Sequence, residues 1–253
     1  MKRILTAAVA LPLLVLITIY FPDWLFAIVV TLFAAAATDE FLALGEKKGI
    51  SRPRRWFLAM PALVVMSFLQ GPEWAAASLV AAAVLLMTAT VLAGKIETGF
   101  DIVLTGLSSL VYCALTLGFL ILIPRPWILV LLAIVWVGDA AAYYGGRALG
   151  RHLLAPKISP RKTVEGSIAG ITGSLIAGIV GGVWVLGKPW IAMVGICTLT
   201  AAAGQIGDLA ESVLKRSAGV KDSSSILPGH GGILDRLDSL FFATPIFYWL
   251  LKA

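Results

Sequence analysis

Residues 166–182 read GSIAGITGSLIAGIVGG, and no charged side chain interrupts the run before Lys188. A helix needs about 20 apolar residues to cross the hydrocarbon core of a bilayer. Small residues recur along this run, and small residues let helices pack closely within lipid. The sequence therefore predicts a membrane-spanning helix over residues 167–187.

Comparable runs recur along the whole chain of 253 residues, 59% of which are hydrophobic. Soluble domains contain roughly 45–50% apolar residues, so the fold class expected is an all-α, polytopic integral membrane protein without a separate soluble domain. We predict about nine transmembrane helices, at residues 4–20, 24–44, 57–70, 75–93, 102–122, 127–144, 167–187, 189–206 and 233–251. The first span begins as a signal peptide does, but no small-residue cleavage site follows it, so we expect it to be retained.

The distribution of Lys and Arg predicts the orientation of these spans. If the N-terminus is cytoplasmic, every one of the 20 basic residues except Arg125, Lys188 and Lys252 falls on the cytoplasmic side, as the positive-inside rule requires. Two cytoplasmic connections, 145–166 and 207–232, are long and polar. We therefore expect an active site at the cytoplasmic face of the cell (inner) membrane.

Motif content divides the chain into two regions. Residues 1–122 hold spans one to five and few polar motifs, whereas residues 123–253 hold spans six to nine and both polar loops. The two cysteines, Cys113 and Cys197, lie inside apolar runs without a neighbour at metal-ligand spacing, which is typical of small buried residues.

The first polar cluster surrounds the start of the ninth span. On a helix continuing from the eighth span, Asp208, Ser212 and Lys215 share one face, and Asp235 and Asp238 lie one turn apart where the ninth span begins. Magnesium is usually held by one or two carboxylates together with substrate phosphates, so this pattern favours a magnesium–polyphosphate site. The alternative is a set of interfacial charges that solvate a loop. His230 is interpreted either as a proton carrier or as a loop histidine bonded between glycines.

The second polar cluster lies between the sixth and seventh spans. Asp139, Tyr143 and Arg147 follow one another by single helical turns. The loop after them is basic and rich in hydroxyls, and it leads directly into the helix predicted from Gly166; its polar residues are Lys157, Ser159, Lys162, Thr163 and Glu165. The N-terminus of a helix favours anions. The alternative is an ordinary positive-inside loop.

Two weaker features lie in the N-terminal half. Asp39 and Glu40 in the second span either reach a cavity or pair with Lys47 or Lys48. The basic run EKKGISRPRR, residues 46–55, acts as a topology signal or attracts anionic lipid, to which each basic residue contributes about 1 kcal/mol near a charged leaflet.

Residues 212–236 resemble the signature of the phosphatidate cytidylyltransferases, S-x-[apolar]-K-R-x4-K-D-x-[small]-x2-[apolar]-P-x-H-G-G-[apolar]-x-D-R. Every specified position is met: Ser212, Leu214, Lys215, Arg216, Lys221, Asp222, Ser224, Leu227, Pro228, His230, Gly231, Gly232, Ile233, Asp235 and Arg236. The stretches SPRKTVEG (159–166) and DAAAYYGGRALG (139–150) resemble two further elements of that family. The N-terminal half matches only in length and hydropathy.

The resemblance implies that CTP and phosphatidate (phosphatidic acid) react to CDP-diacylglycerol and pyrophosphate with Mg²⁺ and a second metal ion. The metal ligands it implies are Asp208 and Asp235, followed by Asp222 and Asp238, and the catalytic set is Asp208, Ser212, Lys215 and Asp235. The substrate-binding residues it implies are Arg216, Lys221, His230, Arg236, Lys162, Thr163, Glu165, Ser159, Asp139, Tyr143 and Arg147. We expect membrane lipids and a second copy of the chain in a homodimer as partners, and no nucleic acid.

Two other functions remain open at this point. A cytidylyltransferase acting on another lipid phosphate, such as an isoprenoid ether, fits the same residues. A transporter would also explain carboxylates within spans, but it predicts inverted repeats and charges near the bilayer midplane, whereas these charges gather at one face. A CDP-alcohol phosphotransferase fits poorly, because its D-G-x2-A-R motif is absent.

Overall fold

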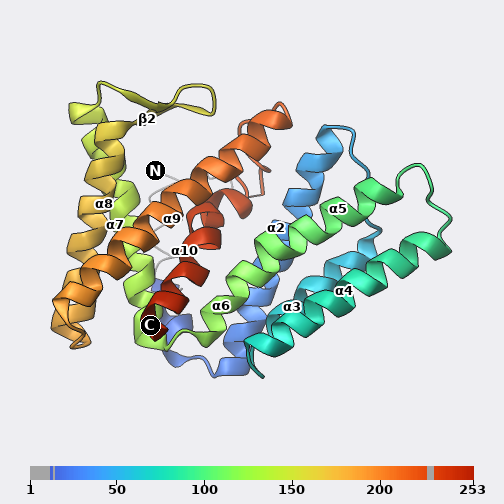
Figure 1. Ribbon diagram of the computed structural model, residues 1–253, viewed down its shortest axis with the longest axis horizontal. Coiled ribbons are helices and arrows are strands. Elements are labelled where there is room, and N and C mark those ends of the chain that lie inside the picture. The colour runs from blue at the N-terminus through green and yellow to red at the C-terminus, as the bar shows by residue number, and fades with distance from the viewer. Residues whose placement is uncertain (1–11, 14, 227–230) are drawn as a thin grey trace. The chain divides into compact units, whose positions relative to one another are not determined.

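The computed structural model describes residues 12–13, 15–226 and 231–253, and it is predominantly helical (Figure 1). The α-helices are α2 Asp23–Lys47, α3 Met60–Ser67, α4 Pro72–Leu92, α5 Gly99–Ser109, α6 Thr116–Leu122, α7 Arg125–Leu149, α8 Val164–Ile179, α9 Trp190–Ser217 and α10 Leu234–Lys252. Three shorter helical segments are η1 Arg55–Ala59, η2 Leu110–Leu115 and η3 Val180–Val185, of which the last two are π-helical. The helical fold class is confirmed.

One element departs from the all-α prediction. The polar loop after α7 contains an antiparallel hairpin of β1 Leu153–Ala155 and β2 Ser159–Thr163. Leu153 pairs with Thr163 and Ala155 with Ser159, and Ile158 N donates to Ala155 O at 3.1 Å across the turn. Pro156 is the second residue of that turn, where its fixed φ suits a chain reversal.

Six helices of the described residues are long and apolar enough to cross a membrane: Asp23–Lys47, Pro72–Leu92, Gly99–Leu122, Arg125–Leu149, Val164–Val185 and Trp190–Ser217. They correspond to the predicted spans two and four to eight, so the chain is an integral membrane protein by length and composition.

The other three predicted spans are not confirmed. Most of span 4–20 lies outside the described residues. Span 57–70 corresponds to the helix Arg55–Ser67, which is shorter than the ~20 residues a crossing needs. Span 233–251 is the helix α10, but Asp235, Arg236 and Asp238 put three charges into its first five residues, where a long apolar segment would be required.

The helices pack into two compact units. Unit 1 consists of Met1–Leu122 and Leu214–Leu237, and unit 2 of Ile123–Val213 and Asp238–Ala253. The end of α9, the loop after it and the start of α10 therefore pack with the N-terminal helices. The division at residue 122 was predicted from the distribution of motifs and does not describe how the helices pack. It stays a prediction.

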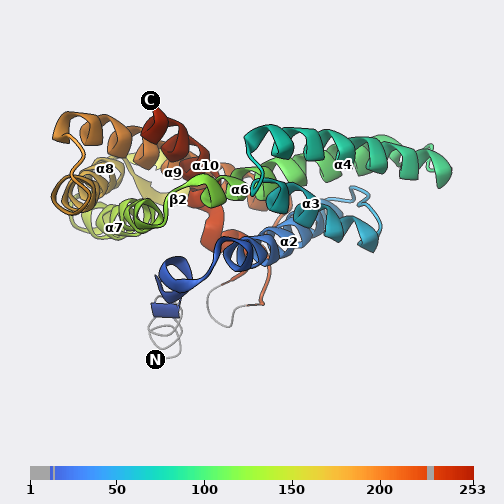
Figure 2. The same ribbon diagram turned by 90° about the horizontal axis from the view of Figure 1, so that it is seen from below.

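In unit 1, α2 packs against α3, α6 and η2, and α4 runs beside α3 (Figures 1 and 2). The core side chains include Phe57, Phe68, Leu86 and Leu110, all of which are fully buried. A side chain at Gly118 would overlap the Phe68 ring, so α6 and α3 approach closely because this position is glycine.

In unit 2, α7 and α8 lie side by side along most of their length (Figures 1 and 2). A Cβ at Gly138 or Gly145 of α7 would overlap Ser174 or Ala169 of α8. Ser174 Oγ also donates to Ile134 O at 2.7 Å. The close helix packing predicted from the small residues of 166–182 is thereby confirmed.

Candidate active site

Three charged side chains predicted as site residues come together in unit 2. Lys162 of β2 forms an ion pair with Asp208 of α9, and Asp139 of α7 interacts electrostatically with both. These three residues are called the Asp208 cluster below. The side chains of Lys162 and Asp208 retain 27% and 29% of their exposed surface, so a soluble ligand can reach both partners of the pair.

A hydrogen bond one turn before Asp208 fixes this part of α9. Gln205 donates from Nε2 to Ser167 O at 3.0 Å and accepts from Ser167 Oγ. Because Gln205 and Asp208 are three residues apart on one helix, they lie on neighbouring positions of its surface. The bond to α8 therefore orients Asp208 as well.

The hairpin that carries Lys162 is held at both ends. Thr163 caps α8, since its Oγ1 accepts from Gly166 N at 3.1 Å. The Glu165 carboxylate accepts from Arg151 N at 3.0 Å and from His152 N at 3.2 Å, and it contacts His152 Nδ1 at 2.6 Å. Thr163 and Glu165 thus order the loop that presents Lys162. His152 was missed by the sequence reasoning, for which the only signal was its rarity as one of two histidines.

The remaining predicted residues of this region are not brought to Asp208. Tyr143 is exposed on α7 and packs edge-on against Tyr144, with ring centroids 5.2 Å apart. Arg147 is exposed on the next turn, and Ser159 begins β2. Within the described ranges, no hydrogen bond or ion pair joins these three residues to Asp208.

The predicted residues Lys215 and Asp235 come together in unit 1. Lys215 Nζ donates to Asp235 Oδ1 at 2.6 Å, and the two side chains are only 11% and 7% exposed. Asp235 Oδ2 accepts from Ser223 N at 2.9 Å, from Ser223 Oγ at 2.8 Å and from Gly232 N at 2.8 Å. We call Lys215, Ser223, Gly232 and Asp235 the Asp235 cluster.

These contacts stabilise the ionised form of Asp235. Burial alone would raise the pKa of the carboxyl, but the bonds from Lys215, Gly232 N and Ser223 N outweigh it, so the pKa lies below its ordinary value. Asp235 is therefore a carboxylate whose acceptor capacity is already used by the protein.

The two glycines of the signature leave room for this arrangement. Gly231 has a φ of 76°, a left-handed conformation that glycine adopts without penalty, and a Cβ there would lie 2.6 Å from Asp235 Oδ2. A Cβ at Gly232 would overlap Ser223 Oγ and Glu40 Oε2. Both positions thus need glycine because backbone and carboxylates approach closely.

Glu40 of α2 is a buried carboxylate that the sequence reasoning ranked too low. Its carboxylate is 3% exposed and accepts four hydrogen bonds from Ser223, Ser224, Ile233 and Leu234. Among the described residues, neither Glu40 nor its neighbour Asp39 forms an ion pair with Lys47 or Lys48. Asp39 instead pairs with Arg52 at 2.5 Å.

The other predicted residues of the signature lie around these contacts. Ser212 is half-buried on α9, and Lys221, Asp222 and Arg236 are exposed. Arg216 donates to Val220 O at 3.0 Å, and Asp238 Oδ1 accepts from Ser239 N at 2.6 Å. Arg216 and Asp238 thus each form a hydrogen bond with a residue close to them in the sequence. His230 lies outside the described residues.

The donor set was compared with the needs of magnesium. No group of three or more His, Cys, Asp or Glu side chains gathers among the described residues. Magnesium in nucleotide sites is usually held by one or two carboxylates plus substrate phosphates and water, which Asp208 with its neighbour Asp139 can provide. Asp235 can offer Oδ1 when Lys215 turns away, because Oδ2 is bound by three donors. The carboxylates of Asp208, Asp139 and Asp235 therefore fit a magnesium ion whose other ligands are substrate phosphates and water.

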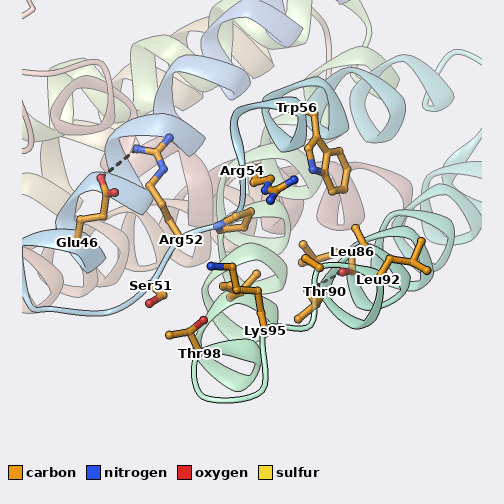
Figure 3. A pocket seen from close by; sticks show the side chains of 14 residues that line it. Glu46, Ser51, Arg52, Arg54, Trp56, Leu86, Thr90, Leu92, Lys95 and Thr98 are labelled. Atoms are coloured by element: carbon orange, nitrogen blue, oxygen red, sulfur yellow. Dashed lines mark hydrogen bonds and ion pairs between the residues drawn. The ribbon is translucent and has the colours of Figure 1, made fainter.

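A cavity of about 590 Å³ lies elsewhere in unit 1, and none of the signature residues lines it (Figure 3). Its lining includes Arg52, Arg54, Trp56, Lys95 and Thr98. In Figure 3 the Arg52 guanidinium is bonded to Glu46, at 3.2 Å. This cavity is therefore separate from the chemistry that the motifs predict.

The comparisons with known proteins agree with the motifs. A model of the "Cytidylyltransferase family" matches residues 1–253, the entire chain. The chain belongs to the cytidylyltransferase family. Three members of the Asp235 cluster, Lys215, Gly232 and Asp235, are specified positions of the signature that residues 212–236 resemble.

Relatives of the family carry a more specific name. Proteins named phosphatidate cytidylyltransferase from Staphylococcus saprophyticus and Staphylococcus haemolyticus are 37% and 38% identical over 87% of this chain and 87% of their own length. One of the same name from Bacillus subtilis is 50% identical over 47% of this chain and 44% of its own length. The chain thus spans less than half the length of the Bacillus subtilis relative.

Proposed function

We propose that this chain is a phosphatidate cytidylyltransferase, which transfers the cytidylyl group of CTP to phosphatidate and yields CDP-diacylglycerol and pyrophosphate. The observation that carries the proposal is the similarity to staphylococcal proteins of that name over 87% of both chains. The same similarity supports an enzyme over the transporter alternative. The proposal also accounts for lysine–carboxylate pairs in a chain of apolar helices.

The reaction is a displacement at phosphorus. An oxygen of the lipid phosphate attacks the α-phosphorus of CTP, the bond from that phosphorus to the bridging oxygen breaks, and pyrophosphate leaves with the electron pair. Such transfers depend on positioning and charge neutralisation more than on covalent chemistry. The attacking phosphate is already an anion near neutral pH, so no general base is required.

Lys162 and Lys215 are suited to neutralise phosphate charge. In the absence of substrate each ammonium is held by a carboxylate, Asp208 or Asp235. When a polyphosphate binds, the ammonium can turn to phosphate oxygens, and the carboxylate oxygen it leaves becomes available. Each pair therefore couples anion binding to the exposure of a carboxylate.

Asp208 in its cluster and Asp235 Oδ1 in the other are each suited to hold magnesium, which when bound would neutralise charge on the phosphates. Asp222 and Asp238 are second candidates by sequence, and the second metal ion remains part of the proposal. Asp208 and Lys215 belong to the same uninterrupted helix α9, so two turns, roughly 10 Å along the axis, separate them.

The orientation and assembly of the chain are also proposals. The positive-inside distribution of Lys and Arg supports a cytoplasmic N-terminus and cytoplasmic polar loops in the cell (inner) membrane. The small-residue faces of the helices are compatible with a homodimer. Phosphatidate would present its head group at that cytoplasmic surface.

The test is a product assay on purified, detergent-solubilised protein. Radiolabelled CTP, dioleoyl phosphatidate and Mg²⁺ should give a labelled lipid, CDP-diacylglycerol, which EDTA should abolish and the substitution Asp208→Asn should reduce by roughly 100-fold or more. Asp208 is the better control residue because its half-exposed side chain can change with little effect on folding. Product from an isoprenoid-ether phosphate but not from phosphatidate would instead establish the related alternative, and folded protein without either product would overturn the proposal.

A further inference from the structure

Glu40 is a carboxylate in an unexpected environment. It lies on α2, a 25-residue apolar helix, and only 3% of its surface is exposed. A charged group within a membrane span is costly and is usually functional, and a buried polar group persists where it is hydrogen-bonded. Its partners therefore indicate why it is there.

The four hydrogen bonds to Glu40 come from two places, Ser223 and Ser224 within the connection between α9 and α10, and Ile233 and Leu234 where that connection meets α10. Ser224 Oγ and Ile233 N donate to Oε1 at 2.7 and 3.0 Å, and Ser223 Oγ and Leu234 N donate to Oε2 at 2.8 and 2.8 Å. One carboxylate thus joins the middle of the connection between α9 and α10 to the start of α10.

The position of Glu40 also suits the charge at the start of α10. The first backbone N–H groups of a helix have no partner within it, and a negative charge is favoured there. Glu40 accepts from Ile233 N and Leu234 N, and Asp235 accepts from Gly232 N. Two carboxylates from distant parts of the sequence therefore share the N-terminus of α10.

Ser223 connects Glu40 to the Asp235 cluster. Its Oγ lies 2.8 Å from Glu40 Oε2 and 2.8 Å from Asp235 Oδ2, and its N–H donates to Asp235 Oδ2. A hydroxyl has a single hydrogen, so Ser223 Oγ donates to one carboxylate at a time. The location of Ser223, and with it that of Asp235 Oδ2, depends on the bond to Glu40.

We propose that Glu40 is a positioning residue for nucleotidyl transfer: through Ser223 and the N-terminus of α10 it holds Asp235 so that Oδ1 faces Lys215 and is available to a metal–phosphate ligand. The inference rests on the proposed function for its catalytic part. Glu40 itself is fully bonded to the loop, so it acts through Asp235 and not on the substrate. The N-terminal helix α2 thereby contributes to the active site.

The experiment uses the full-length protein and three substitutions. Glu40→Gln keeps the size of the side chain but presents an NH₂ group to two of the four donors. Ser223→Ala removes the connection to Asp235. Ser224→Ala is the matched control, because it also deletes one serine bond to Glu40 but leaves the contacts of Asp235 in place.

Two readouts separate positioning from stability. In Glu40→Gln, hydrogen exchange at the amides of Ile233 and Leu234 should become at least ~10-fold faster, since both amides lose a charged acceptor. The Mg²⁺ concentration for half-maximal turnover should rise ~10-fold or more in Glu40→Gln and in Ser223→Ala, and less than ~2-fold in Ser224→Ala. A purely structural role lowers the active fraction without changing the Mg²⁺ dependence.

Each result decides a separate point. Exchange and Mg²⁺ dependence like wild type in Glu40→Gln, or equal effects of the two serine substitutions on Mg²⁺ dependence, would overturn the proposal. If Glu40→Gln fails to fold, the serine pair carries the test, because both variants retain Glu40. If wild-type protein turns over no substrate, the proposed function fails, and hydrogen exchange alone then decides whether Glu40 holds the loop.

Discussion

The Asp208 and Asp235 clusters both pair a lysine with an aspartate, yet their surroundings differ. Lys162–Asp208 is half-exposed, whereas Lys215–Asp235 is nearly buried and Asp235 accepts three further hydrogen bonds. Ion pairs open to solvent contribute little to stability, but removing one partner of a buried pair is strongly destabilising. We therefore expect the pair in the Asp208 cluster to serve mainly the proposed ligand binding, and the pair in the Asp235 cluster to serve both ligand binding and folding.

The largest effect should follow from removing the charge of the buried pair. Asp235→Asn removes the carboxylate charge that Lys215 Nζ contacts at 2.6 Å and faces an NH₂ group toward donors, so we expect the free energy of unfolding to fall by about 3 kcal/mol and turnover to be lost. Thermal unfolding in detergent and the product assay measure the two effects. A variant as stable as wild type would show that the bonds to Asp235 do not support the fold.

Removal of the partly exposed Asp208 charge should separate activity from stability. Asp208→Asn should lower kcat by roughly 100-fold or more, as the loss of one group that stabilises transition-state charge does, while stability changes by less than about 1 kcal/mol. The same unfolding and product assays apply. If Asp208→Asn destabilised the protein as much as Asp235→Asn, the contrast between the clusters would be refuted.

The smallest effect concerns the loop that presents Lys162. Thr163→Ala removes the cap of α8 and should cost about 1 kcal/mol, with a moderate rise of the KM for CTP because Lys162 is next to the cap. Thr172→Ala is the matched control, since Thr172 Oγ1 donates to Ile168 O within the same helix and its removal should be nearly neutral. Equal unfolding temperatures of the two variants would count against the capping role.

Much of this structure follows from local patterns in the sequence. Apolar runs predicted six of the long helices because length and composition decide a membrane span. The spacing of Asp208, Ser212 and Lys215 placed them on one face of a helix, and α9 does continue through all three. The glycines of 166–182 predicted close packing, which depends only on side-chain size.

The rest depends on contacts that no local pattern contains. Glu40 and Ser223 are 183 positions apart, so the residues around Glu40 indicated only a cavity or the nearby lysines as its surroundings. The hairpin after α7 forms because a turn follows Ala155, whereas charge alone described the segment as a loop. The hydrogen bonds to Asp235 Oδ2 come from the folded loop. The sequence therefore predicted Asp235 as a metal ligand but did not predict that the same carboxylate holds the loop in place.

The continuity of α9 has a geometric consequence. Each residue turns a helix by about 100°, so the seven steps from Asp208 to Lys215 bring both side chains back to nearly the same direction. The segment between them contains neither glycine nor proline, the residues at which helices usually bend. A single alanine inserted there would rotate Lys215 away from the line of Asp208 by about a quarter of a circle, which makes the angular phase of this helix a property that the enzyme has to keep.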